Sequence, residues 1–116
     1  MEIVIHRVYD EGAPEGYRVL VDRLWPRGLT KDKAALDDWC KELTPSPALR
    51  RWFGHEPAKW AEFSRHYRAE LKAHVEEGRA LLARAGEGPL VLLYAAKDKD
   101  HTHALVLEGF LRGLAR

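Results

Sequence analysis

Two short stretches of the sequence combine cationic and aromatic side chains of a kind that can hold an anion. In the first, Arg23 and Arg27 flank Trp25 and Pro26. A guanidinium group pairs with phosphate or carboxylate through two parallel hydrogen bonds, and an indole offers a flat face on which a ring can stack. We therefore interpret Arg23, Trp25 and Arg27 as candidate ligand-binding residues. The alternative is a turn whose arginines pair with surface acids while Trp25 fills the core.

The second stretch, residues 97–103, precedes the last amphipathic segment of the chain. Its candidate ligand contacts are Lys97, Asp98, Thr102 and His103. Thr102 or Asp100 can cap the helix that is expected next, and the free amide groups of a helix N-terminus favour an anion. His103 is the candidate for acid–base catalysis, because an unperturbed imidazole titrates near neutral pH. The alternative is an ordinary solvated loop.

The same stretch offers donors for a metal ion, but in a poor arrangement. His101 and His103, with Asp98 and Asp100, are residue types that suit zinc, manganese or iron. Histidines two positions apart face the same side only on extended backbone, and a helix is expected to begin here. We therefore expect no metal and no other cofactor.

Other catalytic chemistries find little support. The sequence has neither a glycine-rich phosphate loop nor a nucleophile elbow. Ser46 is explained as a helix cap, and Ser64 as a residue on a helix surface. Cys40 is the only cysteine, which excludes an internal disulfide and a zinc site of several thiolates. We interpret it as a small buried hydrophobe rather than a nucleophile.

Charge and hydropathy limit the partners. The formal net charge is +1, so we do not expect a dedicated electrostatic grip on nucleic acid or on a membrane surface. Residues 50–53, Arg-Arg-Trp-Phe, could contact nucleic acid, but their helical spacing more simply gives a core face and a solvent face. No apolar run approaches the ~18 residues of a membrane span, and no secretory signal opens the chain. We expect a cytoplasmic protein.

The amide side chains are missing altogether. The sequence contains no Asn and no Gln, only one Met and one Cys, and abundant Glu and Arg. Depletion of thermolabile residues together with many charged ones favours a thermophilic source. A GC-rich genome would also enrich Ala, Arg and Gly, and this is the alternative.

The elements that must position these residues follow from periodicity. Strands are predicted at residues 3–8, 17–22 and 90–94, the last a continuously apolar run typical of a strand buried on both faces. A helix is predicted to begin at Ser46-Pro47 and to end at Gly54. Pro57 opens a long helix with an apolar stripe that runs to Leu82, with a bend expected at Gly78, and a last helix covers residues 104–114. Residues 31–43 are ambiguous between a short helix and an edge strand.

This order predicts an α/β fold, a three-layer-like domain over residues 1–116 with a small, mostly parallel sheet and helices packed on it. We expect the strand at 90–94 to run parallel to the strand at 17–22, joined by a helical crossover. The loops at 23–28 and 95–103 would then leave the same edge of the sheet. In open α/β sheets, ligands bind outside the carboxyl ends of the strands.

Three motifs in order carry a family resemblance. They are residues 21–28 (Val-Asp-Arg-Leu-Trp-Pro-Arg-Gly), then Pro45-Ser46, Leu49-Arg50 and Trp52-Phe53, then residues 92–98 (Leu-Leu-Tyr-Ala-Ala-Lys-Asp) with His103-Ala104. The chain resembles, over nearly its whole length, the YeaO-like family of domains of unknown function, domain of unknown function 488. The resemblance implies an α/β fold and supplies no activity or catalytic residue.

Two hypotheses of function follow. The first is a site for an anionic, phosphate-like small molecule at the carboxyl edge of the sheet, either binding or enzymatic. The second is a non-enzymatic interaction or regulatory module whose exposed aromatic residues contact protein or nucleic acid. A concave pocket would favour the first, and a flat apolar patch of several hundred Å² the second.

Overall fold

A parallel sheet of four strands forms the centre of the fold. The sequence predicted a small, mostly parallel sheet and three of these strands. The computed structural model describes residues 1–116. The strands are β1 (Ile3–Arg7), β2 (Tyr17–Leu20), β3 (Asp38–Trp39) and β4 (Leu90–Tyr94). Their spatial order is β1-β4-β2-β3, and every neighbouring pair is parallel. β4 has a partner strand on each side, and all five of its residues are buried.

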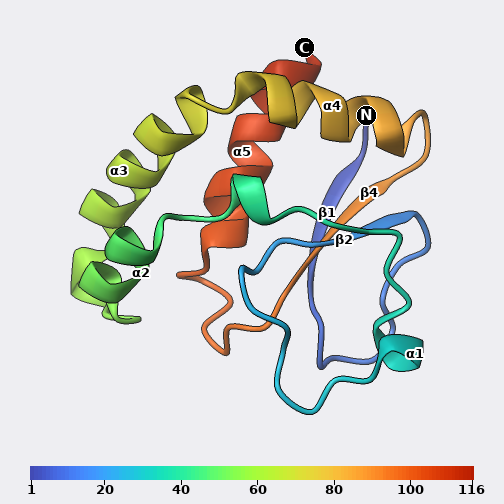
Figure 1. The fold of residues 1–116 in the computed structure, drawn as a ribbon, viewed down its shortest axis with the longest axis horizontal. Coiled ribbons are helices and arrows are strands. Elements are labelled where there is room, and N and C mark those ends of the chain that lie inside the picture. The colour runs from blue at the N-terminus through green and yellow to red at the C-terminus, as the bar shows by residue number, and fades with distance from the viewer.

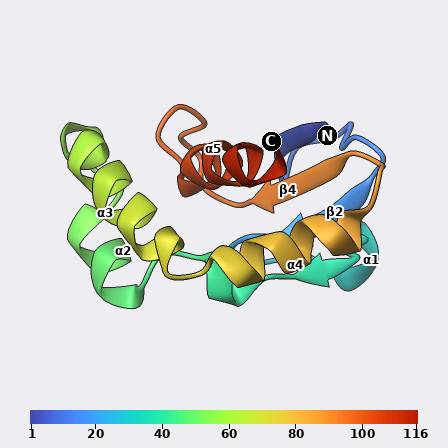
Figure 2. The same cartoon turned by 90° about the horizontal axis from the view of Figure 1, so that it is seen from above.

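Helices pack around this sheet and around one another. They are α1 (Lys31–Ala34), α2 (Pro47–Phe53), α3 (Trp60–Lys72), α4 (Val75–Ala85) and α5 (His103–Ala115). α5 packs against β1 and β4. α3 and α4 both pack against α5, and together they form a wide arc around it (Figures 1 and 2). None of the helices combines the length and the apolarity needed to cross a membrane.

The hydrophobic core lies between the helices and one face of the sheet. Alternate strand residues enter it, since side chains of a strand point in turn to opposite faces. From β2 and β4 and their ends these are Val19, Val21, Leu90, Leu92 and Tyr94. The helices contribute Phe63, Tyr67, Leu71, Leu81, Leu107 and Leu111, among others. The helical stripe predicted from residues 60–82 is therefore a core face.

The prediction of one continuous helix after Pro57 is wrong. Residues 57–59 form a 3₁₀ turn, and the helix that follows stops at Ala73 and restarts as α4. The amides of Ala73 and His74 bond the carbonyls of Glu70 and Leu71, three residues back, and this tightened turn ends α3. The break lets both halves lie against α5.

Gly78 lies within α4 rather than at the break. A Cβ at this position would lie 2.7 Å from Cδ1 of Leu114 and 3.1 Å from Cε2 of Phe110. Glycine here therefore allows α4 and α5 to approach closely.

Residues 31–43, which the sequence left open between a short helix and an edge strand, contain both. They form α1, then the short edge strand β3, then a 3₁₀ turn at Lys41–Leu43. Strand β3 pairs with β2 through Val19–Asp38 and Leu20–Trp39. Its two-residue length explains why no strand periodicity could be recognised.

Gly16 sets the start of β2 beside the start of β4. The amide of Tyr17 donates to the carbonyl of Pro89 at 2.8 Å. At Gly16 φ is +150°, and a Cβ would clash with that same carbonyl oxygen. The glycine therefore permits the close approach that puts β2 and β4 in register.

Candidate functional site

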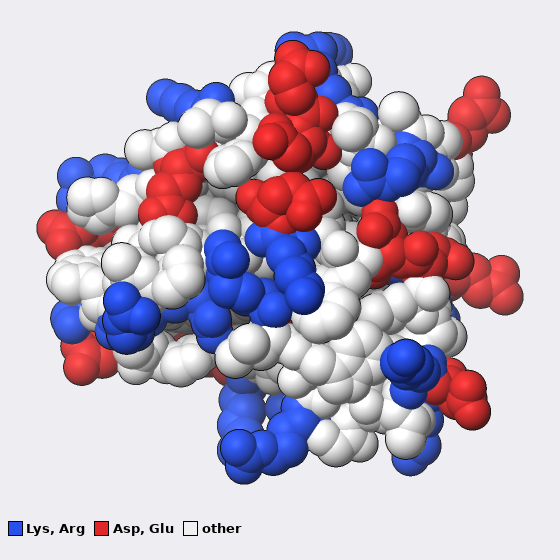
Figure 3. Space-filling view, in the orientation of Figure 1, with Lys and Arg blue, Asp and Glu red and all other residues white.

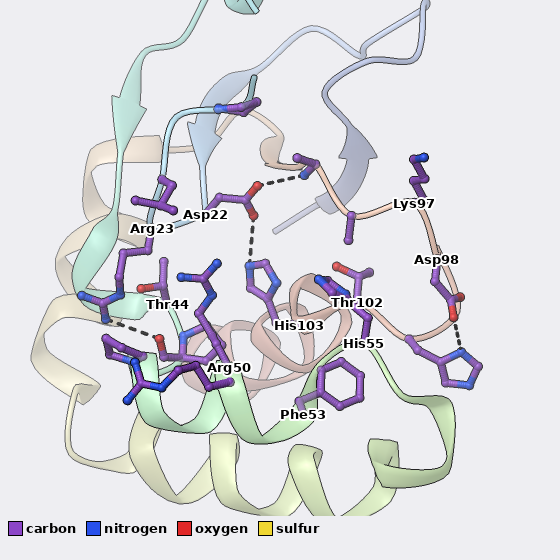
Figure 4. A pocket seen from close by; sticks show the side chains of 18 of the residues that line it. Asp22, Arg23, Thr44, Arg50, Phe53, His55, Lys97, Asp98, Thr102 and His103 are labelled. Atoms are coloured by element: carbon purple, nitrogen blue, oxygen red, sulfur yellow. Dashed lines mark hydrogen bonds and ion pairs between the residues drawn. The ribbon is translucent and has the colours of Figure 1, made fainter. Parts of the chain in front are cut away.

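The loops that follow β2 and β4 meet at the carboxyl edge of the sheet. The backbone amide of Ala95, directly after β4, donates to a carboxylate oxygen of Asp22 at 3.0 Å. This contact confirms that both loops leave the same edge, as the parallel pairing of β2 and β4 required. A cavity of about 770 Å³ opens between these loops, α2 and the first turn of α5 (Figure 4).

Every residue predicted from the sequence as a ligand contact lines this cavity. They are Arg23, Trp25, Arg27, Lys97, Asp98, Thr102 and His103. The structure therefore brings together two segments that lie at least 70 positions apart in sequence. Their part in ligand binding stays a prediction.

The cavity holds more cations than the sequence indicated. Arg50 and Arg51 of α2 join Arg23, Arg27 and Lys97 in its lining. None of these cations has a carboxylate oxygen within 4.0 Å, since the ion pairs of the protein involve other residues. Lys and Arg atoms gather around a hollow on this face of the molecule (Figure 3).

Arg23 and Arg27 have no carboxylate partner, but they differ in burial and in hydrogen bonding. Arg27 is exposed, and only its backbone carbonyl has a partner, the hydroxyl of Tyr9 at 2.6 Å. Arg23 is half-buried, and one of its terminal nitrogens donates to the carbonyl of Pro45 at 3.4 Å. Its Nε is buried and has no hydrogen-bond partner. The alternative in which both arginines pair with surface acids is therefore wrong.

Helix α2 carries Arg50 and Arg51 and is fixed by its first residue. Ser46 accepts a hydrogen bond from the amide of Leu49, which is the cap predicted from the sequence, and Gly54 ends the helix with φ at +53°. The Ser46 hydroxyl also donates to Glu70 of α3 at 2.6 Å, and the Ser46 amide donates to the other oxygen at 2.9 Å. α2 is thus tied to α3 with its arginines directed to the sheet edge.

Asp22 and His103 form a recessed pair within the cavity. Nε2 of His103 lies 2.7 Å from the carbonyl oxygen of Val21 and 3.3 Å from a carboxylate oxygen of Asp22. Since a carbonyl oxygen only accepts, Nε2 carries a proton and Nδ1 is the unprotonated nitrogen of the neutral ring. Only 17% of each side chain is exposed.

Burial shifts the two members of this pair toward their neutral forms. It lowers the pKa of His103, although the Asp22 charge and the Val21 carbonyl oppose this shift. It raises the pKa of Asp22, against the opposing effects of His103, the Ala95 amide and the charge of Arg50. His103 thus stands as a neutral, hydrogen-bonded group that joins α5 to β2.

Aromatic rings form part of the cavity wall. Phe53 is stacked on Phe63 with ring centroids 4.4 Å apart, and both line the cavity. Trp25 also lines it. Its indole N–H donates to the Leu29 carbonyl at 2.7 Å, and its ring forms a T-shaped pair with the ring of Trp39, with centroids 5.5 Å apart. Trp25 is therefore held rigidly by its own loop and is not a core residue.

The metal-ligand reading of the histidine pair finds no support in the geometry. His101 bonds Asp98 through Nδ1 at 2.8 Å, whereas His103 turns to Val21. No group of three or more His, Cys, Asp or Glu side chains could hold a metal ion. Thr102 is buried and caps α5 by accepting from the amide of Ala104.

Cys40 is a buried residue of the core cluster, as predicted. Burial, the largest cause, and the nearby Glu42 carboxylate raise the pKa of its thiol to about 12. Since the thiolate is the reactive form, Cys40 is not an activated nucleophile.

Asp22, Arg50 and Arg51 are the charged site residues that the sequence analysis did not predict. Asp22 was interpreted only as the last residue of a strand, and the arginines as the solvent face of a helix. A charged residue at the carboxyl end of an apolar strand was the available signal for Asp22. No local signal marks the arginines, because their place depends on how α2 docks onto α3.

Comparison with known proteins places the chain in a family. A family model described as the inactive DUF488-N3 subclade matches residues 2–115. YeaO of Escherichia coli, called an uncharacterized protein, is 50% identical over 115 residues, which cover 98% of this chain and all of that protein. Uncharacterized proteins of Mycobacterium bovis and Mycobacterium tuberculosis are 39% identical over 112 residues, which cover 94% of this chain and 92% of theirs. No solved structure matches the chain significantly. The chain belongs to the inactive DUF488-N3 subclade and, with it, to the YeaO-like family that its motifs resemble.

Proposed function

We propose that the cavity at the carboxyl edge of the sheet binds a small anionic molecule and that its role is recognition rather than catalysis. The observation that carries this proposal is the set of cations in the cavity wall that no carboxylate neutralises. Arg23, Arg27, Arg50, Arg51 and Lys97 outnumber the lining carboxylates, Asp22 and Asp98.

Unpaired cations in a concave site repel one another more strongly than on open surface, because less water screens them. A bound anion relieves this repulsion and gains charge-assisted hydrogen bonds from the guanidinium groups. Asp98 offers little relief, since its carboxylate already bonds His101. A phosphate-like group is the anion that such a set of donors suits best.

Two observations favour recognition over catalysis. The matching family is described as inactive. The residue best suited to acid–base work, His103, has its Nε2 proton committed to Val21 and a pKa lowered by burial. The ligand would therefore be held in the cavity and released unchanged.

Calorimetric titration at low ionic strength tests the proposal with inorganic phosphate, ribose 5-phosphate and nucleotides as probes. We expect saturable binding of at least one phosphate-bearing probe at a concentration below about 1 mM. The Arg50→Ala variant should bind it at least about tenfold more weakly, because a hydrogen bond to a charged group contributes about 1.5–3 kcal/mol.

Arg79→Ala is the matched control, since Arg79 is an exposed arginine of α4 outside the cavity and should not affect binding. Absence of saturable binding for every phosphate-bearing probe would refute the proposal. Equal weakening by Arg50→Ala and Arg79→Ala would also refute it, since binding would then follow net charge rather than this site.

A further inference from the structure

The polar groups of the cavity are divided by depth. Arg27, Arg50, Arg51 and Lys97 are exposed cations. The recessed polar groups are different in kind: they are Asp22 and His103, each 17% exposed, with the buried Thr44 and Thr102. Figure 4 shows Asp22 and His103 together between the strand ends and the start of α5. The mouth is therefore cationic and the floor is not.

The floor accepts hydrogen bonds rather than anions. One oxygen of Asp22 receives the Ala95 amide at 3.0 Å, and the other faces His103 Nε2 at 3.3 Å. The proton on Nε2 is directed mainly to Val21, at 2.7 Å, so this second oxygen keeps capacity to accept. A phosphate placed against Asp22 would meet a like charge. The part of a ligand that reaches the floor must therefore be uncharged and able to donate a hydrogen bond.

Aromatic rings form the wall beside this floor. Phe53 and Phe63 are stacked with an interplanar angle of 24°, and both line the cavity. Phe53 and the neighbouring His55 ring have centroids 6.1 Å apart, and His55 adopts a φ of +58° that side chains rarely accept. Planar aromatic walls favour planar rings over aliphatic chains or sugars alone.

We infer that the ligand is bipartite, a phosphate monoester whose phosphate lies among the arginines at the mouth and whose uncharged, hydrogen-bond-donating planar ring lies against Phe53 with a donor toward Asp22. This inference rests on the proposed anion-binding function and adds the chemical class of the ligand. A cavity of about 770 Å³ is of the size that surrounds a ligand of mononucleotide dimensions. A nucleoside monophosphate is the simplest probe with both parts.

The test compares four kinds of probe on the unmodified protein by calorimetry: the four common ribonucleoside monophosphates, ribose 5-phosphate, inorganic phosphate and the nucleosides without phosphate. We expect at least one monophosphate to bind about tenfold or more tightly than ribose 5-phosphate, since stacking of one base contributes about 1–3 kcal/mol. The corresponding nucleoside should bind more weakly than its monophosphate.

Asp22→Asn is the informative variant. Its carboxamide oxygen can still accept from the Ala95 amide, while the other position becomes a donor. We expect this variant to lose the advantage of the monophosphate and to bind ribose 5-phosphate as well as, or better than, the unmodified protein. If this variant fails to fold, the probe comparison on the unmodified protein still decides.

The outcomes separate the two proposals. Equal affinity for ribose 5-phosphate and for every monophosphate would overturn the bipartite ligand and leave the anion site intact. Nucleosides that bind as tightly as their monophosphates, or a complete lack of binding by phosphate-bearing probes, would instead overturn the anion site itself.

Discussion

Nε2 of His103 donates to the carbonyl oxygen of Val21 across 2.7 Å, and so joins the first residue of α5 to the end of β2. These residues lie 82 positions apart in sequence, and the bond fixes the back of the cavity. Because the imidazole is largely enclosed, its protonation opposes folding.

The first prediction follows from this bond. Burial lowers the folded-state pKa of His103 below its ordinary value of 6.5, so the unfolded chain binds more protons as the pH falls through 6.5. The contribution of His103 to the free energy of unfolding is therefore fully present above that pH and is lost on acidification below it. His103→Gln keeps a donor but does not titrate, so its stability should fall less between pH 7 and about pH 5.

Urea unfolding at several pH values measures this difference. The other histidines are present in both proteins, so the difference between the profiles reports His103 together with its effect on the pKa of Asp22. Identical pH profiles of the two proteins would contradict the buried neutral assignment.

Substitution of Arg23 and of Arg27 should have different effects on thermal stability. Arg27→Ala should leave the thermal midpoint nearly unchanged and weaken anion binding, because its exposed guanidinium contacts no protein atom by hydrogen bond or ion pair. Arg23→Ala should weaken binding and also lower the midpoint, since it removes the bond to Pro45 and half-buried methylene groups. Binding that survives both substitutions at full strength would exclude this loop from the site.

Ser46→Ala should weaken ligand binding from a distance. It removes the cap of α2 and leaves one Glu70 oxygen without its hydroxyl partner, which should cost about 1–2 kcal/mol. Because α2 carries Arg50 and Arg51, affinity should fall as well. Thr30→Ala, which removes the N-cap hydroxyl of α1, is the control and should reduce stability slightly without an effect on binding. Equal affinities of the two variants would mean that α2 does not need this anchor.

Gly16→Ala should destabilise the sheet by roughly 2 kcal/mol or more, since the new methyl group meets a backbone carbonyl at a φ of +150°. Gly88→Ala tests the same corner of the fold without a clash, because nothing lies within 4 Å of a Cβ there. Chemical denaturation should show a large loss for the first and little change for the second. If Gly16→Ala left the free energy of unfolding unchanged, β2 and β4 could separate at their starts at no cost in stability.

Thermal unfolding should occur late. The absence of Asn and Gln and the density of Glu and Arg predict a midpoint above about 75 °C. Scanning calorimetry measures it directly. A midpoint within about 45–65 °C, the range of mesophilic domains, would attribute the composition to the genome instead.

The sequence predicted those parts of the molecule that local patterns determine. The apolar run of β4, the cap at Ser46 and the Pro-Gly loop after β2 were all recognisable, and parallel pairing then placed two loops at one edge. What could not be predicted depends on contacts between distant elements. The break after α3 follows from the way both halves lie against α5, and the place of Arg50 follows from the bond between Ser46 and Glu70.

The central position of β4 has a consequence for the order of folding. β1 and β2 do not pair with each other. Both pair with β4, which is the last strand in the sequence, and β4 is the only partner of β1. During synthesis, β1 therefore stays unpaired until β4, which ends at residue 94, has left the ribosome. Only β2 and β3 can pair earlier. Such non-local pairing slows folding and leaves strand edges exposed in the meantime. The cavity, whose two loops follow β2 and β4, therefore comes into existence in one late step together with the sheet itself.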